Sequence, residues 1–118
     1  MLRGSHMSSA VAKRLDSIKE RSGITSREVA QLLDTTPQTV SRWQTGRSTP
    51  QRQSLDRLLK LEWLADQLGQ FYPAEEARLW LFSPHPELDG ERPADLIAED
   101  RMDEVLEIID RLQSAAYR

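Results

Sequence analysis

Apolar residues recur every three or four positions along most of the chain. Val11, Leu15 and Ile18 form a first stripe that closes at Ser22-Gly23, and further stripes cover residues 50–69 and 105–112. No stretch shows the alternation of apolar and polar residues that a half-buried strand requires. The pattern therefore predicts an all-α fold.

Boundary signals mark a short second helix after the first stripe. Thr25 or Ser26 can cap its start, and Glu28 is placed to complete a capping box. The helix carries apolar residues at positions 29, 30, 32 and 33, and Asp34-Thr35 then forms a short turn.

A third helix is expected directly after this turn. Thr36 is a suitable N-cap, Pro37 suits the first helical turn, and the helix should run to about Gln44. Gly46 stands where a left-handed C-cap belongs. A long fourth helix is expected over residues 50–69, from Pro50 to Gly69.

The third helix has one apolar face and one polar face. Val40 and Trp43, three residues apart, should point into the core, which makes Trp43 a core residue and not a stacking platform for bases. Gln38, Thr39 and Arg42 then face outward near the helix N-terminus. Gln suits adenine and Arg suits guanine in the major groove. We therefore expect this face to read DNA bases.

Hydroxyl and cationic residues around the third helix suit contacts with the DNA backbone, which Ser26, Arg27, Thr45, Arg47 and Ser48 could supply. The complete set of candidate DNA-binding residues is Ser26, Arg27, Thr36, Gln38, Thr39, Ser41, Arg42, Thr45 and Arg47.

The segment TSREVAQLLDTTPQTVSRWQTGRSTP, from Thr25 to Pro50, strongly resembles the Cro/repressor helix-turn-helix family. Ala30 matches the small residue where the two helices of that motif cross. Asp34 stands where the family usually has Gly in a left-handed turn, a conformation that Asp tolerates. The resemblance implies binding to double-stranded operator DNA. A homodimer is expected, because two recognition helices on half-sites one turn apart bind more tightly than one.

The distal half carries a second resemblance. After FYPAEEARL the chain reads WLFSPHPELDGERPADLI from Trp80 to Ile97, which looks like the toxin-binding domain of the Xre/MbcA/ParS antitoxin family. His85 stands where that family usually has Asn. The matching positions are Trp80, Leu81, Pro84, Leu88, Gly90, Pro93, Asp95 and Leu96.

This second resemblance implies an antitoxin that represses its own operon and neutralises a RES-domain toxin that consumes NAD. It implies that the C-terminal residues Tyr117 and Arg118 occlude the toxin's active site, although the same residues could equally be a frayed tail. The candidate toxin-binding residues are Trp80, Pro84, Leu88, Arg92, Tyr117 and Arg118. The competing interpretation is a stand-alone phage-type repressor whose distal half only dimerises or senses.

The resemblances together suggest a division of the chain into two units. Residues 1–7 (MLRGSHM) resemble an expression-tag remnant, residues 8–69 form the DNA-binding domain, and residues 70–118 form the toxin-binding domain. The net charge of −3 conceals a matching asymmetry. Residues 8–60 hold ten Lys/Arg against five Asp/Glu, whereas residues 61–118 hold five Arg against fourteen Asp/Glu. A basic half attracts a polyanion and an acidic half suits a cationic partner, but solvated helix faces would give the same asymmetry.

Composition excludes several other classes of protein. The chain has no Cys, so neither a disulfide scaffold nor a Cys-based zinc site is expected. No apolar run approaches the length of a membrane span, and a cytoplasmic protein is expected. The adjacent acidic pairs point to different helix faces, and no phosphate loop, dinucleotide fingerprint or catalytic triad is present. We therefore expect a protein that is not an enzyme and uses neither metal nor cofactor.

Two further expectations concern the middle third. The aromatic residues there should mainly form a buried seam between the two halves, although some could form a dimer face. His85, a lone histidine between two prolines, should lie on the surface. The aromatic set is Trp63, Phe71, Tyr72, Trp80 and Phe82.

Overall fold

The computed structural model describes the backbone of residues 3–116 and the side chains of residues 10–115. Over this range the chain forms seven α-helices and one short 3-10 helix, with no strand, which confirms the predicted all-α class. The helices are α1 (Arg3–Ser22), α2 (Ser26–Leu32), α3 (Pro37–Thr45), α4 (Arg52–Phe71), α5 (Ala74–Leu81), η1 (Pro86–Leu88), α6 (Pro93–Ala98) and α7 (Met102–Ala116).

The helix boundaries of the first half follow from local chemistry. The Thr25 side chain accepts a hydrogen bond from the Glu28 backbone N–H at 3.2 Å, and Glu28 accepts one from the Thr25 N–H at 3.0 Å, which is a complete capping box. Asp34 adopts the left-handed conformation expected of the turn, with φ at 56°. Gly46 ends α3 with φ at 80°. These predictions are confirmed.

The long helix α4 differs from its prediction at both ends. It begins at Arg52, two residues after Pro50, and it continues past Gly69 to Phe71. Gly69 serves close packing instead of ending the helix, because a Cβ at this position would lie 3.3 Å from Cδ of Arg21. Tyr72 follows as the C-cap, and its extended backbone is the conformation favoured before Pro73.

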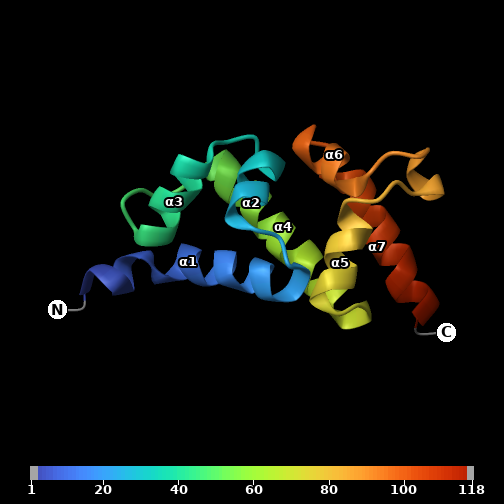
Figure 1. Ribbon diagram of the computed structural model, residues 1–118, viewed down its shortest axis with the longest axis horizontal. Coiled ribbons are helices and arrows are strands. Elements are labelled where there is room, and N and C mark those ends of the chain that lie inside the picture. The colour runs from blue at the N-terminus through green and yellow to red at the C-terminus, as the bar shows by residue number, and fades with distance from the viewer. Residues whose placement is uncertain (1–2, 117–118) are drawn as a thin grey trace.

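The helix α4 joins the two halves of the molecule (Figure 1). In the N-terminal half of the molecule it contacts α1, and in the C-terminal half it contacts both α5 and α7. One continuous hydrophobic core runs through both halves, and its largest fully buried side chains include Ile18, Val29, Leu58, Leu64, Leu81, Leu96 and Ile109. The predicted boundary at residue 69 therefore falls within a helix that both halves share.

Two arginines tie α2 to the distal half. Arg57 of α4 donates hydrogen bonds to the carbonyl oxygens of Leu32 and Leu33 at 3.1 and 3.3 Å, and to that of Ile97 in α6 at 2.8 Å. Arg78 of α5 forms an ion pair with Glu28 at the other end of α2. Both ends of α2 are thus held by guanidinium groups.

The aromatic seam is only partly as expected. Tyr72, Trp80 and Phe82 are half-buried and pack against the core, but Trp63 has 42% of its surface exposed. Trp63 is exposed because its neighbours on α4, Leu61, Leu64 and Ala65, already fill the buried side of the helix. Trp63 therefore lies outside the buried seam, and for this residue the alternative prediction of a dimer face stays open.

Candidate functional site

The orientation of α3 decides which side chains it offers to a partner. Val40 is fully buried and Trp43 is 3% exposed, so this face of the helix belongs to the core, as predicted. Gln38, Ser41 and Arg42 are exposed on the other side, and Thr39 is half-buried between the two faces. The prediction is confirmed for the inward Val40 and Trp43 and for the outward Gln38 and Arg42, whereas Thr39, predicted to face outward, is only partly exposed.

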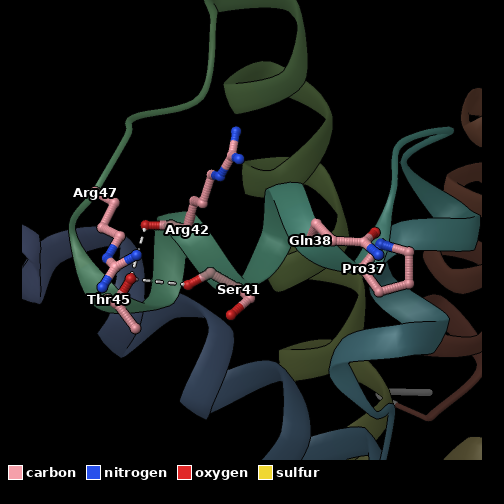
Figure 2. Close-up of a pocket in the computed structure, with 6 residues that line it drawn as sticks. All are labelled: Pro37, Gln38, Ser41, Arg42, Thr45 and Arg47. Carbon is pink, nitrogen blue, oxygen red and sulfur yellow. Dashed lines mark hydrogen bonds between the residues drawn. The ribbon is translucent and has the colours of Figure 1, made fainter.

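The outward face of α3 forms a shallow groove of about 600 Å³ (Figure 2). Gln38 lies near the start of the helix and Thr45 and Arg47 lie near its end, with Ser41 and Arg42 between them. The complete lining is Pro37, Gln38, Ser41, Arg42, Thr45 and Arg47. This lining holds two guanidinium groups and no carboxylate, a balance that suits a polyanion.

Hydroxyl groups hold both ends of α3. The Thr36 hydroxyl accepts a hydrogen bond from the Thr39 backbone N–H at 3.1 Å and lies 2.9 Å from the Thr39 hydroxyl. At the other end, the Thr45 hydroxyl donates to the Ser41 carbonyl at 3.1 Å. These bonds fix the helix that carries the groove, whereas contacts of Thr36, Thr39 and Thr45 with DNA phosphates stay a prediction.

The remaining candidate DNA-binding residues flank the groove. Gly46 turns the chain after α3, and the following Arg47 donates its backbone N–H to the Arg42 carbonyl at 2.9 Å. Ser26 and Arg27 are exposed in the first turn of α2, outside the groove lining. The structure therefore brings five of the candidates, Gln38, Ser41, Arg42, Thr45 and Arg47, together in one groove and leaves Ser26 and Arg27 on the neighbouring helix.

The distal candidates lie on and beside the loop from Phe82 to Arg92. Trp80 stacks against His85 with ring centroids 4.8 Å apart, and the His85 Nε2 lies 2.8 Å from the Trp80 carbonyl oxygen, to which it can donate. His85 is half-buried, so the prediction of a surface histidine was wrong. The His85 ring is covered because the loop folds back onto α5 and brings the ring against Trp80. This contact depends on the path of the loop.

Backbone hydrogen bonds hold this loop in one shape. The His85 carbonyl accepts from the Gly90 N–H at 2.9 Å, and the His85 N–H donates to the Glu91 carbonyl at 3.2 Å. Gly90 has φ at 83°, where an L side chain would be strained, although open space surrounds its Cα. The loop is therefore a closed, defined surface between α5 and α6.

The candidate toxin-binding residues differ in their exposure. Pro84 and Arg92 are exposed and Trp80 is half-buried, but Leu88 is 6% exposed and packs in the core. Leu88 therefore anchors the loop to the hydrophobic core. Tyr117 and Arg118 lie outside the described residues.

Arg92 forms a bidentate pair with Asp95 at the start of α6, with N···O distances of 2.9 and 2.7 Å. The hydrogen bonds from Arg92 hold the pKa of the Asp95 carboxyl below its ordinary value, and those to Asp95 raise the pKa of Arg92. Both groups stay ionised, so an exposed planar guanidinium is held in a fixed position.

Leu79, the most exposed of the large apolar side chains that the structure describes, was not among the residues predicted from the sequence. It lies on α5 with 60% of its surface exposed, whereas Ala77 and Leu81 of the same helix are fully buried. A helical wheel of α5 would have identified it, because residue 79 lies opposite the buried positions.

The distal surface is acidic over α7 and the segment before it. Its exposed carboxylates are Glu99, Asp100, Asp103, Glu104, Glu107 and Asp110. Within the described part of the chain no three acidic or histidine side chains gather as a metal site would require. None of the helices that the structure describes is long and apolar enough to cross a bilayer.

Comparisons with known proteins give a consistent result for both halves. A helix-turn-helix family model matches residues 10–69, and the model for the antitoxin Xre/MbcA/ParS C-terminal toxin-binding domain matches residues 67–114. The mycobacterial cidal antitoxin MbcA of Mycobacterium tuberculosis is 37% identical over 98 residues, covering 83% of this chain and 87% of MbcA. A probable mycobacterial cidal antitoxin from the same organism is 33% identical, covering 80% of this chain and 81% of the relative.

A solved structure extends the likeness to three dimensions. The chain matches a component of the crystal structure of the M. tuberculosis MbcT-MbcA toxin-antitoxin complex with a TM-score of 0.75 and 36% identity. The match covers 88% of this chain and 94% of that one, so both halves and their arrangement are shared.

Proposed function

The chain belongs to the Xre/MbcA/ParS family of antitoxins, which bind a toxin and are not enzymes, and from this premise we propose that it neutralises a RES-domain, NAD-consuming toxin and represses its own operon. The single observation that carries the proposal is the similarity over both halves to an antitoxin whose complex with a toxin has been solved.

The outward face of α3 supports operator binding. Gln38 and Arg42 present amide and guanidinium groups of the kind that read adenine and guanine. The flanking groups Ser26, Arg27, Thr45 and Arg47 contact phosphates, and two copies of the chain bind two half-sites.

The surface around the loop from Phe82 to Arg92 supports toxin binding. Pro84, Arg92 and Trp80 contact the toxin there, and the exposed Leu79 of the adjoining α5 adds an apolar contact. The acidic groups of α7 face a toxin surface whose cations bind the phosphates of NAD. Tyr117 and Arg118 then enter the toxin's active site.

The test is co-expression with the product of the neighbouring gene, which we expect to be a RES-like protein. Cells that express the neighbour alone should stop growing and lose NAD, and the chain should restore both growth and the NAD pool. Leu79→Asp should weaken the rescue, whereas Glu75→Gln, an exposed change on the same helix, should leave it intact. A neighbour that is harmless without the chain would contradict the toxin half of the proposal and favour a stand-alone repressor.

A further inference from the structure

An exposed apolar stripe runs along α4, away from both candidate surfaces. Leu55, Leu59 and Trp63 follow each other at intervals of four residues, which places them on one side of the helix. Leu59 is 38% exposed and Trp63 is 42% exposed. Neither residue belongs to the proposed DNA or toxin contacts, so the stripe is unexplained by either function.

Two shallow grooves follow this stripe and share Leu59. One, of about 590 Å³, lies along Leu55 and Asp56 at the start of α4. The other, of about 420 Å³, lies between α1 and α4, and Trp63 and Asp66 line it. Together they form an extended surface with Leu59 at its centre.

The charges at the ends of the stripe are arranged symmetrically and are opposite in sign. Arg52 lies seven residues before Leu59, and Asp66 lies seven residues after it. In the same way, Leu55 lies four residues before Leu59, and Trp63 lies four residues after it. Seven residues span about 10 Å of helix, or two turns, so all five side chains share one face. Arg52 forms no ion pair with another described residue, and Asp66, paired with Arg21 at 3.1 Å, is still partly exposed.

We propose that this stripe is where two copies of the chain pair, with their α4 helices antiparallel about a two-fold axis at Leu59. In such an interface the same patch is used by both copies, and residue i of one meets residue j of the other while j meets i. Leu59 then packs against Leu59 of the other copy. Across the same axis Leu55 of each copy packs against Trp63 of the other, and Arg52 pairs with Asp66. A parallel arrangement would place Arg52 against Arg52 and Asp66 against Asp66.

Asp56 and Glu62, three residues from Leu59 on either side, carry like charges, but each is paired within its own copy, with Lys60 and with Arg14. The opposite charges at the two ends and the apolar residues between them therefore favour a second copy as the occupant. The inference deepens the proposed function, which requires a dimer on the operator. The dimer interface can be tested separately from the antitoxin function, because pairing through α4 is measured on the protein alone, without toxin or DNA.

The first test reverses the charges at the two ends. By sedimentation equilibrium, Arg52→Glu and Asp66→Lys should each weaken the dimer at least about tenfold, because each creates like-charge contacts across the axis. The double variant should regain most of the wild-type dimer, since each new Glu meets a new Lys. Glu75→Lys, an exposed change on α5, should have no effect. A double variant as weak as the singles would overturn the proposal, as would a monomeric wild-type protein.

The second test uses the absence of cysteine from the chain. A disulfide needs Cβ atoms about 3.5–4.5 Å apart, a condition that residues next to a two-fold axis can meet. Under mild oxidation Leu59→Cys should yield mostly covalent dimer, whereas Leu79→Cys, at a more exposed position, should stay mainly monomeric. Equal cross-linking of the two variants would overturn the proposal. Failed toxin neutralisation by an intact dimer would refute the proposed function and leave this interface standing.

Discussion

Individual residues at the start and end of each helix of the DNA-binding motif set the geometry of the groove. Thr36 caps α3, Gly46 ends it, and Val40 with Trp43 fixes its rotation against the core. A different rotation of α3 would bury Gln38 and Arg42, so the buried residues determine which side chains of α3 are exposed to a partner. Recognition by α3 therefore depends on residues that never touch DNA.

Trp43→Ala should lower the free energy of unfolding by about 3–5 kcal/mol, because it leaves a cavity where a 3% exposed ring fills the core. Gln31→Ala, at an exposed position on the neighbouring helix α2, should cost less than about 0.5 kcal/mol. Urea unfolding followed by circular dichroism measures both. Equal costs for the two variants would show that α3 is not anchored through Trp43.

Residue-level predictions from the sequence succeeded where the deciding interaction is local. The capping box of Thr25 and Glu28, the left-handed Asp34 and the inward Trp43 all depend on neighbours within a few positions, and all were predicted correctly. His85 was misplaced because its contact with Trp80 depends on how the loop folds back.

At the scale of elements, α2 is held at both ends by arginines from other helices. Arg57 caps its C-terminal carbonyls and joins them to α6, and Arg78 binds Glu28 at its N-terminus. Neither contact could be predicted from the sequence, because the partners are 24 to 50 residues apart. Gly69 was misread for the same reason, since the side chain that covers it, Arg21, comes from α1.

Arg57→Met should destabilise the fold by about 2–3 kcal/mol, because it leaves the carbonyls of Leu32, Leu33 and Ile97 without their charged donor. Arg111→Met, at an exposed position on α7, should change stability by less than about 0.5 kcal/mol. Thermal unfolding of the two variants measures the difference. A cost for Arg57→Met no larger than for Arg111→Met would mean that these hydrogen bonds contribute nothing net.

The ion pair at the other end of α2 predicts a pH dependence. Burial alone would raise the pKa of Glu28, but hydrogen bonds from Arg78 and Thr25 and the charge of Arg78 outweigh it and hold the pKa below its ordinary value of 4.5. A carboxyl with a lowered pKa stabilises the fold above its unfolded-state pKa and loses that contribution as the pH falls through the folded-state value.

Glu28→Gln should therefore lower the free energy of unfolding by about 1–3 kcal/mol near neutral pH. The gap between wild type and variant should shrink as the pH falls below 4.5 towards the lower pKa of Glu28 in the folded protein, where the folded carboxyl takes up its proton. Urea titrations at several pH values measure this gap. A gap that stays constant down to acid pH would exclude an ionised Glu28 as the source.

At the scale of the whole molecule, a basic half and an acidic half share one core through α4. The charge asymmetry in the sequence, with ten Lys/Arg in residues 8–60 and fourteen Asp/Glu in residues 61–118, maps onto opposite ends of an elongated molecule of 50 × 27 × 23 Å. The family and the all-α class were predictable from motifs of consecutive residues. The shared core and the exposed stripe on α4 were not, because both depend on how the halves pack.

Deleting Tyr117 and Arg118 should impair toxin neutralisation at least about tenfold and leave operator affinity unchanged, because the proposal places these residues in the toxin's active site. Toxin NADase activity at increasing antitoxin concentration measures the first effect, and a gel shift measures the second. Ser114→Gly, an exposed change just before the tail, is the matched control. Full inhibition by the truncated chain would exclude the tail mechanism.

If one chain carries separate surfaces for operator and toxin, the double variant Gln38→Ala with Arg42→Ala should separate the two activities. Both side chains are exposed on α3, so the fold should be intact, and each should cost about 1–3 kcal/mol of operator binding. Operator affinity and toxin inhibition should be measured on the same preparation. We expect operator binding to be lost and toxin inhibition to be unchanged, whereas a parallel loss of both, or an unchanged operator affinity, would show that the two surfaces are not separate as described.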